Sequence, residues 1–425
     1  MSSPTRIVFL AHFYPPEMGG AAARLHGLAR WLAEYGHDVT VITGFPNYPS
    51  GVIPDKYRGA FLRREEMDGV RVIRTLVYAS PRRGSIRRLA NYFSFVFTSL
   101  FVGLFLRRRP DVVVASCPPL FIGISGWLIA LVRRSKFVFD LRDLWPDVAV
   151  EAGEFKRDSL ITRLGFWLAK FLYNRAHHIT PVTENKTQRL VEKGISEKKI
   201  TVVANGVDLD LIPTLDQRES LRTELGLDGK FVVAYAGLIG IAQKVEMIIG
   251  TAQKVRDQSD IHFLIVGDGV RRNKLEELVR EHQLDNVTLL PRQPKERISH
   301  LLSAADVAFV PLASSGLQDA IPSKLLEAWA HRRPVILVAG GEAAEIATSC
   351  EGAIVVAPED PASITNAVTR FRDDPLMRDR YAENGYDYVA ANLTRAQLAR
   401  QMESVLLGII DGQKKQRPQQ VQTAS

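Results

Sequence analysis

A chain of 425 residues is too long for one ordinary hydrophobic core, so we expect two domains. Its composition is globular, with 46% hydrophobic and 24% charged residues. The charge is uneven: residues 1–200 carry 30 Lys and Arg against 17 Asp and Glu, and residues 201–425 carry 25 against 30. The first half therefore faces something anionic. Nucleic acid and anionic lipid both fit this charge, and the apolar segment described below favours lipid, so we expect no nucleic-acid partner.

The cysteines, histidines and first residues bear on location and metal binding. Cys117 and Cys350 lie far apart and match no metal spacing, which favours a reducing compartment. The nine histidines form no H-E-x-x-H or comparable set. The first residues run directly into a predicted strand, with no secretory signal. We therefore expect a cytoplasmic protein with no metal and no cofactor.

The first 43 residues predict a strand, a glycine-containing turn, a helix and a second strand. The strands are residues 6–13 and 38–43, and residues 21–34 have the period of a helix. This order is typical of doubly wound α/β domains with parallel sheets. Gly19 and Gly20 lie just before the helix, where they allow the backbone to approach a phosphate or a sugar. Residues 44–69 then read as one long loop rich in turn residues.

Residues 89–106 contain no charged residue and predict an apolar helix. Four phenylalanines recur at every fourth position, at Phe93, Phe97, Phe101 and Phe105. Arginines stand on both sides of it, at Arg82, Arg83, Arg87, Arg88, Arg107, Arg108 and Arg109. The segment is only just long enough to span a bilayer, and basic residues at both ends argue against crossing. We expect residues 82–109 to lie in the anionic cytoplasmic leaflet. The alternative is a buried helix whose phenylalanines belong to the core.

Polar residues follow the predicted strand 137–140 of the first domain, in the order Asp140-Leu-Arg142-Asp143. Open α/β sheets bind their ligands at this end of the strands. We therefore expect Arg142 and Asp143 to face a substrate. The domain ends near the turn Asn205-Gly-Val-Asp208, and residues 208–218 read as a linker.

The second half repeats the alternation of strands and helices, with predicted strands at residues 231–236, 261–266, 287–290 and 307–311. After the last of these, the stretch from Asp319 to Glu327 predicts a loop and a helix that begins near Pro322 or Ser323. The first amides of such a helix attract an anion, while the carboxylates of Asp319 and Glu327 accept hydrogen bonds from sugar hydroxyls. A nucleotide-sugar offers both groups. The alternative is an ordinary capped helix with solvated acids.

Up to about residue 408 the chain resembles the retaining family 4 glycosyltransferases. The resemblance is carried by a series of motifs: Tyr14-Pro-Pro-Glu-Met-Gly-Gly20, Gly36-His-Asp-Val-Thr-Val-Ile-Thr43, Asn205-Gly-Val-Asp208, Gly267-Asp-Gly269, and Asp319-x7-Glu327 followed by Arg333-Pro-Val-Ile336. Two more motifs, Phe45-Pro-Asn-Tyr-Pro-Ser-Gly51 and Asp143-Leu-Trp-Pro146, look like the branch that assembles bacterial surface polysaccharides such as colanic acid and O-antigen.

The resemblance implies an α/β protein with two Rossmann-like domains facing across a cleft, the GT-B fold, whose last helices cross back to the first domain. The expected boundaries are 1–208, 209–378, crossing helices 379–408 and a disordered tail 409–425. The implied donor-binding residues are Gly19, Gly20, Gly237, Gly240, Gln243, Lys244, Gly267, Gly269, Ser323, Lys324 and Glu327. The implied acceptor-side residues are His12, Arg142 and Asp143, and those expected to serve catalysis are Asp143, Asp319 and Lys324.

The sequence departs from the family pattern at two positions. The family's Glu-x7-Glu element begins here with Asp319, which is one methylene shorter, whereas the ribose-binding position is kept as Glu327. The family's arginine after the first glycine of the second domain is replaced by Leu238, and the following lysine position holds Gln243. The negative charge of the donor diphosphate is then balanced either by Lys244 or by Lys324 together with the helix amides. We favour Lys324 with the helix amides.

The implied function is transfer of a sugar, with retention, from a nucleoside diphosphate donor (a UDP-sugar is favoured) to a lipid-linked, polyprenyl diphosphate saccharide at the inner face of the membrane. Retention is expected from front-face attack, in which the departing phosphate helps to remove the acceptor proton. Two alternatives stay open: a nucleotide-sugar 2-epimerase of the same architecture, and a non-catalytic membrane scaffold.

Overall fold

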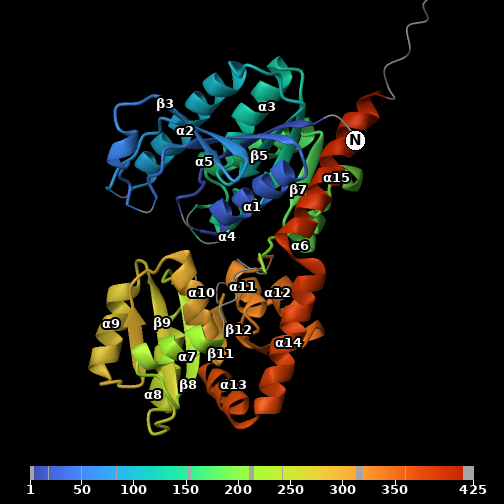
Figure 1. Cartoon of the computed structure of the whole chain (residues 1–425). Helices are drawn as coiled ribbons and strands as arrows, with labels where there is room; N and C mark the ends of the chain where they lie inside the picture. The colour runs from blue at the N-terminus through green and yellow to red at the C-terminus, as the bar shows by residue number, and fades with distance from the viewer. Residues whose placement is uncertain are drawn as a thin grey trace, which may run out of the picture. The chain divides into compact units, whose positions relative to one another are not determined.

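The chain divides into two compact units, each with its own sheet (Figure 1). The computed structural model describes residues 4–17, 19–48, 50–82, 84–151, 153, 155–209, 215–241, 243–312, 319–358 and 360–414. The first unit consists of residues 1–205 together with 395–425, and the second of residues 206–394. Arg83, part of the predicted linker and the end of the predicted tail lie outside the described residues.

A seven-stranded sheet organises the first unit, in the order β3-β4-β2-β1-β5-β6-β7. Its strands are β1 (Arg6–Ala11), β2 (Asp38–Gly44), β3 (Leu62–Met67), β4 (Val70–Thr75), β5 (Val112–Cys117), β6 (Lys136–Leu141) and β7 (His178–Pro181). All neighbours pair in parallel except β3 with β4. β5 is buried along its whole length, as expected for a parallel strand that is covered on both faces.

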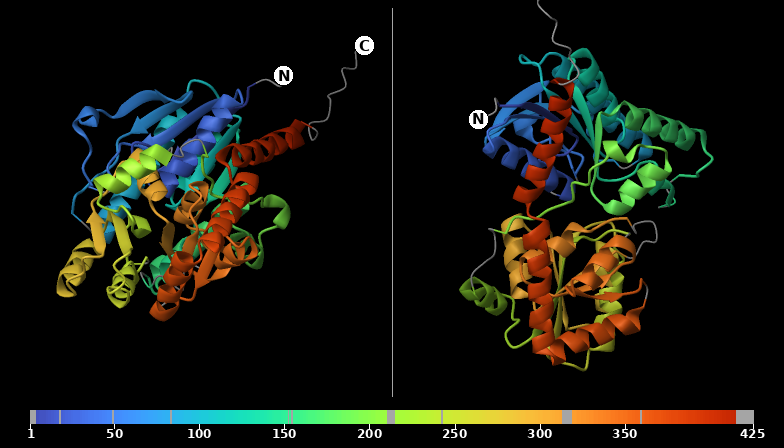
Figure 2. Two further views of the ribbon diagram at one scale, coloured as in Figure 1. Left: turned by 60° about the horizontal axis from the view of Figure 1, so that its bottom comes forward. Right: turned by 90° about the vertical axis from the view of Figure 1, so that its right-hand side faces the viewer.

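Helices cover both faces of this sheet (Figure 2). They are α1 (Gly20–Glu34), α2 (Ser85–Leu104), α3 (Ile122–Val132), α4 (Asp147–Glu151), α5 (Leu160–Arg175), α6 (Glu184–Glu192) and α15 (Arg395–Lys414), with short 3-10 turns η1 (Asp55–Tyr57) and η2 (Glu197–Lys199). Val8 and Leu10 pack in one core with α2, α3 and α5, and Ile7 and Phe9 pack in another with α1 and α15. This alternation follows from the two-residue period of a strand.

The C-terminal helix α15 returns to the first unit and packs along α1, as the resemblance implies. Tyr35 Oη donates to the carbonyl of Ala396 at 2.9 Å, and His37 Nε2 lies 2.8 Å from Glu403 Oε1. Because α15 runs to Lys414, the tail predicted from residue 409 begins within a helix. Residues 415–425 lie outside the described part of the chain.

The second unit has a six-stranded parallel sheet in the order β10-β9-β8-β11-β12-β13. Its strands are β8 (Phe231–Leu238), β9 (Ile261–Asp268), β10 (Val287–Leu290), β11 (Val307–Pro311), β12 (Val335–Val338) and β13 (Ala353–Val356). Its helices are α7 (Leu215–Glu224), α8 (Glu246–Lys254), α9 (Arg272–Glu281), α10 (Lys295–Ala304), α11 (Ser323–Ala330), α12 (Gly341–Ser349), α13 (Pro361–Asp373) and α14 (Pro375–Asn392). Two α/β domains of the doubly wound kind are therefore confirmed.

The single long loop predicted for residues 44–69 is wrong. Residues 55–57 form η1, and residues 62–67 form β3, which pairs antiparallel with β4. The sequence of β3, Leu-Arg-Arg-Glu-Glu-Met, is too polar for a buried parallel strand, and this misled the prediction. Its place explains the charges, because an edge strand keeps one side in water and charged side chains there discourage pairing with other chains.

The four phenylalanines of the predicted stripe lie at the surface. Phe93, Phe97, Phe101 and Phe105 are 38%, 68%, 53% and 73% exposed. These side chains are therefore not core residues, which removes the buried-helix alternative for the phenylalanine stripe. The opposite side of the helix is buried in the core through Phe95 and Val102. No helix in the described part of the chain is both long and apolar enough to cross a membrane.

Candidate functional site

At the carboxyl edge of the second sheet, a lysine lies directly over a glycine. A Cβ atom on Gly237, near the end of β8, would lie 2.0 Å from Cε and 2.8 Å from Nζ of Lys324. Lys324 comes from the first turn of α11, and its Nζ lies 5.7 Å from the centre of the Tyr235 ring. The missing side chain at 237 leaves the space that the lysine stem occupies.

The environment of Lys324 is poorly solvated, and the Glu327 carboxylate acts on it. Burial lowers the pKa of Lys324, and the nearby Glu327 carboxylate opposes this shift. The two residues are three positions apart on α11, with Ser323 at the start of the same turn. The first amides of α11 point out of the helix at this end, where the helix dipole favours an anion. The structure thus brings together Gly237, Ser323, Lys324 and Glu327.

Asp319 lies in a turn shortly before α11 and is buried. The preceding residues 313–318 lie outside the described part of the chain. The predicted contact of Asp319 with the donor sugar stays a prediction.

The predicted loop after β8 contains Gly240, Gln243 and Lys244. A Cβ atom on Gly240 would lie 2.5 Å from Oε1 of Gln243, so the glutamine side chain folds back over the glycine. Lys244 has a positive φ of 42° and stands at the turn into α8. Gln243, which stands at the family's lysine position, therefore contacts Gly240 of the same loop.

Gly267 and Gly269 have a packing role that the sequence did not reveal. A Cβ atom on Gly267 would lie 1.9 Å from the carbonyl oxygen of Gly237, and one on Gly269 would lie 2.2 Å from that of Ile239. Both glycines have φ near 155°, which other residues rarely adopt. Their absent side chains allow β9 and the loop after β8 to approach closely. Their predicted donor contact stays a prediction.

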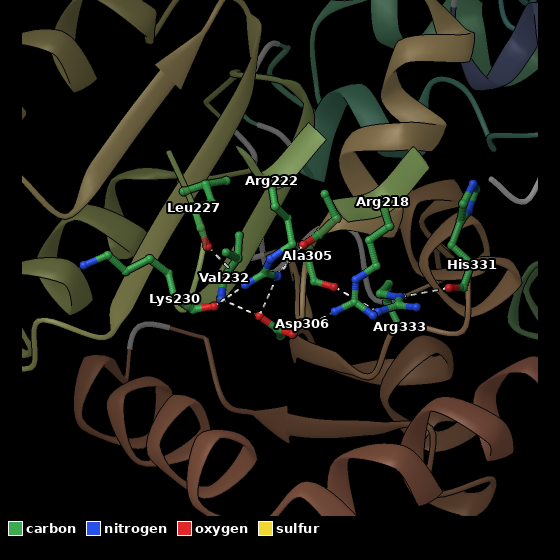
Figure 3. A network of polar contacts seen from close by, with 10 residues as sticks. Arg218, Arg222, Leu227, Lys230, Val232, Ala305, Asp306, His331 and Arg333 are labelled. Carbon is green, nitrogen blue, oxygen red and sulfur yellow. Dashed lines mark hydrogen bonds and ion pairs between the residues drawn. The ribbon is translucent and has the colours of Figure 1, made fainter. Parts of the chain in front are cut away.

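Arg333, from the motif that follows Glu327, belongs to a structural network at the opposite end of the strands (Figure 3). It donates to the carbonyls of Ala305 and His331, both at 2.9 Å. Asp306, which follows Ala305 in the chain, accepts hydrogen bonds from Arg218 at 3.0 Å and from Arg222 at 3.2 Å. Asp306 also accepts from the amide of Val232 at 2.8 Å. This network ties α7 to the starts of β8 and β11, so the arginine in the motif supports the fold.

In the first unit, a buried carboxylate holds two family motifs together. Glu17 Oε1 accepts the amide protons of Asn47 and Tyr48, both at 2.9 Å. Burial raises the pKa of Glu17, and these amide hydrogen bonds oppose the shift. The sequence placed Glu17 and the Phe45–Gly51 stretch in separate motifs and gave no sign of their contact.

Beside this loop lies a hollow of about 1100 Å³, which we call the arginine hollow. Its lining includes Phe13, Gly19, Gly20, Asn47, Tyr48 and Asn91. It also includes three arginines, Arg82, Arg87 and Arg88, and none of its described lining residues is acidic. The predicted Gly19 and Gly20 thus meet a basic cluster that was predicted only as a flank of the apolar segment.

His12 lies behind the lining of the hollow. It is buried, and burial lowers its pKa to about 4, so the imidazole is neutral at pH 7. Its Nε2 donates to Asn91 Oδ1 at 2.6 Å, and Asn91 Nδ2 donates to the carbonyl of Tyr78 at 2.6 Å. His12 Nδ1 has no hydrogen-bond partner among the described residues. The geometry gives His12 a supporting role through Asn91, which does line the hollow.

Arg142 and Asp143 do not line the hollow and follow β6 at the carboxyl edge of the sheet. Arg142 donates to the carbonyl of Pro118 at 2.9 Å. The preceding Asp140 is fully buried and accepts from Arg24 at 2.9 Å, Ser116 at 2.8 Å and Thr180 at 3.1 Å. These bonds fix the base of the loop that carries Arg142 and Asp143. Within the described residues, no three His, Cys, Asp or Glu side chains converge as a metal site requires.

Comparisons with known proteins agree with this division into two units. The model of the glycosyl transferase 4-like domain matches residues 19–206, and that of the glycosyl transferases group 1 matches residues 217–388. The protein named "Putative colanic acid biosynthesis glycosyl transferase WcaI" of Escherichia coli K12 is 27% identical over 88% of this chain and 94% of its own. Glycogen synthase of Mycobacterium tuberculosis is 24% identical over 97% of both chains.

Solved structures share the fold at low identity. HepE of Anabaena, in complex with UDP, superposes with a TM-score of 0.72 at 17% identity and covers 95% of this chain and 100% of its own. Sucrose-phosphate synthase from Thermosynechococcus elongatus has a TM-score of 0.77 at 20% identity and covers 96% and 100%. The chain belongs to the glycosyltransferases with two Rossmann-like domains, the GT-B fold, which transfer sugars.

Proposed function

We propose that the protein transfers a sugar from a nucleoside diphosphate donor, a UDP-sugar, to a lipid-linked saccharide, and that the configuration at the anomeric carbon is retained. This transfer is a step of bacterial surface polysaccharide synthesis at the inner face of the cytoplasmic membrane. The similarity to WcaI supports the pathway class, and the UDP bound to HepE supports the donor base.

The observation that carries the donor half of this proposal is the position of Lys324 over Gly237, beside Glu327. A poorly solvated ammonium and the first amides of α11 form a preorganised positive field for a diphosphate. The Glu327 carboxylate accepts hydrogen bonds from the ribose hydroxyls. Negative charge grows on the diphosphate as the sugar leaves, so the same field lowers the barrier to transfer. Lys324 thereby supplies the charge of the family's missing arginine.

The acceptor half of the proposal assigns Asp143 and Arg142 to the acceptor side, on the loop held by the Asp140 network. The acceptor hydroxyl attacks the anomeric carbon from the face that the diphosphate leaves. The departing phosphate oxygen takes the hydroxyl proton, so no protein nucleophile is needed. The exposed phenylalanines of α2 support a membrane-bound substrate, because apolar side chains beside arginines bind anionic bilayers.

Calorimetric titration with UDP tests the donor half. We expect Lys324→Ala and Glu327→Ala each to weaken binding about tenfold to a hundredfold, the worth of a hydrogen bond to a charged group. Lys244→Ala, the matched loss of a lysine, should change the affinity less than about threefold. Equal effects of the two lysine variants, or UDP affinity within twofold of the native value in Glu327→Ala, would contradict this donor site.

A further inference from the structure

The helix that carries the donor-site residues is short, and its last carbonyl groups depend on donors beyond its end. α11 has eight residues, which is about 12 Å of helix. The carbonyls of its last turn have no later amide within the helix. The His331 amide is shared between two of them, at 3.2 Å from the Glu327 carbonyl oxygen and 3.1 Å from that of Ala328. A shared donor at these distances holds each carbonyl less firmly than one short bond does.

The His331 side chain supplies a shorter bond to the same Glu327 carbonyl. Its Nδ1 lies 2.7 Å from that oxygen, and its Nε2 lies 2.6 Å from Oγ of Ser299 on α10. A carbonyl oxygen only accepts, so Nδ1 carries the proton and donates. Burial lowers the pKa of His331, so the ring is neutral at pH 7 and Nε2 accepts the hydroxyl proton of Ser299. One histidine thus joins α10 to the backbone of Glu327.

A separate contact anchors α11 in the core of the second unit. Trp329, on the same helix, is fully buried, and its Nε1 donates to the carbonyl of Gly352 at 2.8 Å. A Cβ atom on Gly385 of α14 would lie 2.2 Å from Cδ1 of the Trp329 ring, so α14 packs directly against this side chain. Loss of the His331 bond should therefore leave α11 in place and change chiefly how Glu327 is held.

We propose that His331 is a positioning residue for the donor ribose: its Nδ1–H fixes the Glu327 backbone, and this aims the Glu327 carboxylate at the ribose hydroxyls. The inference rests on the proposed function, because Glu327 binds the ribose there. A carboxylate that accepts hydroxyl protons must be held in one place, since a shift of about 1 Å breaks the hydrogen-bond geometry. The protein should therefore distinguish ribose from 2′-deoxyribose, and this discrimination should depend on His331 acting through Glu327.

The test compares two substitutions of nearly equal shape. His331→Asn keeps an N–H donor close to the position of Nδ1, whereas His331→Leu has a similar volume and no donor. Calorimetric titration measures the affinity of each protein for UDP and for 2′-deoxy-UDP. We expect the native protein to bind UDP at least about tenfold more tightly, the worth of one hydrogen bond to a charged group. This ratio should stay within about twofold of the native value in His331→Asn and fall below about threefold in His331→Leu.

Arg332→Gly is the matched control at the same helix end. Arg332 has a positive φ of 50°, which suits glycine, and its Cζ lies 3.5 Å from the centre of the Tyr386 ring. The substitution removes that ring contact and leaves the bonds to the Glu327 carbonyl, so the ratio should stay within about twofold of the native value. The ratio does not depend on the fraction of protein that is folded. A merely structural role of His331 would therefore leave it unchanged.

Ser299→Ala removes the hydroxyl that orients the ring and should lower the ratio at least about twofold. It serves if His331→Leu does not fold, and an unchanged ratio would then overturn the inference. A native ratio in His331→Leu, or an equal fall in His331→Asn or in Arg332→Gly, would overturn it as well.

Glu327→Ala separates this inference from the proposed function, because it should bring the ratio close to one. A preference for UDP that is lost in Glu327→Ala and kept in His331→Leu refutes only the inference. A native protein with no preference, or a Glu327→Ala variant that keeps the preference, refutes the proposed donor site and the inference with it.

Discussion

At the scale of single residues, the most consequential feature is a lysine kept in a poorly solvated place. Burial lowers the pKa of Lys324 because the ammonium loses water, and the Glu327 carboxylate opposes this shift. A cation that is incompletely solvated gains more from a bound anion than one at the open surface does. Gly237 is part of the arrangement, since any larger residue there would displace the lysine stem.

The buried His12 gives a pH-dependent prediction. Its pKa is about 4 in the folded protein, against about 6.5 for an unperturbed histidine. Between these values the unfolded chain binds a proton that the folded chain does not, so stability falls as the pH drops from 6.5 towards 4. From pH 7 to pH 5 this one group contributes a loss of about 2 kcal/mol.

His12→Gln keeps an N–H donor for Asn91 and removes the titration. We therefore expect the variant to lose less stability than the native protein between pH 7 and pH 5, by about the same 2 kcal/mol, in denaturant unfolding of the first unit. His178→Gln is a comparison: burial also lowers the pKa of His178, so this variant should reduce the loss of stability at low pH as well, without removing the hydrogen bond to Asn91. If the native protein and His12→Gln lose the same stability between pH 7 and pH 5, the pKa of His12 is not lowered by folding. That outcome would contradict the prediction.

At the scale of elements, the helices α2, α3 and α5 form a layer over one face of the first sheet, which we call the outer helical layer. Their sequences contain five basic residues and no acidic one. Besides the phenylalanines of α2, the layer exposes Leu131 and Val132 on α3 and Leu160, Ile161, Leu164 and Trp167 on α5. Helices that expose this many apolar side chains and contain no acidic residue are better suited to contact with an anionic membrane than with water.

We predict that two regions of this layer bind membranes. Phe97→Ser with Phe101→Ser, and separately Leu164→Ser with Trp167→Ser, should each lower partition onto vesicles that contain phosphatidylglycerol by about tenfold, because each pair loses apolar area that enters the bilayer. Co-sedimentation measures the partition. Leu376→Ser, which removes a side chain 83% exposed on the second unit, should leave it unchanged. An unaltered partition in both double variants would show that the layer faces water or another protein.

The sequence predicted the strongly periodic elements and missed those whose pattern is set by their neighbours. The alternation of strands and helices and the exposed side of α2 followed from hydrophobic period and charge. The strand β3 was missed because an edge strand needs no apolar pattern. The hollow was missed because Asn91, Glu17 and Tyr48 come from distant segments and meet only in the fold. The sequence did not reveal that Gly267 lies against the backbone of β8, and the predicted donor contact of this glycine stays a prediction.

At the scale of the whole molecule, the two units differ in charge. The first unit contains 35 Lys and Arg against 19 Asp and Glu, a net charge of +16, and the second contains 20 against 28, a net charge of −8. The basic half contains the outer helical layer and the arginine hollow, and the other half contains Lys324 and Glu327. Under the proposed function, this distribution would attract the first unit to an anionic surface, while the second unit would take the soluble nucleotide. The attraction weakens as salt is added.

The central claim is sugar transfer that depends on the second unit's donor site, and one measurement tests it directly. The protein is incubated with a panel of radiolabelled UDP-, GDP-, ADP- and dTDP-sugars and a polyprenyl diphosphate monosaccharide in anionic vesicles. We predict that label from a UDP-sugar moves into the lipid phase, and that Glu327→Ala, with its fold intact, reduces this transfer at least about tenfold. Conversion of a nucleotide-sugar without any lipid acceptor, or equal transfer by Glu327→Ala, would contradict the account.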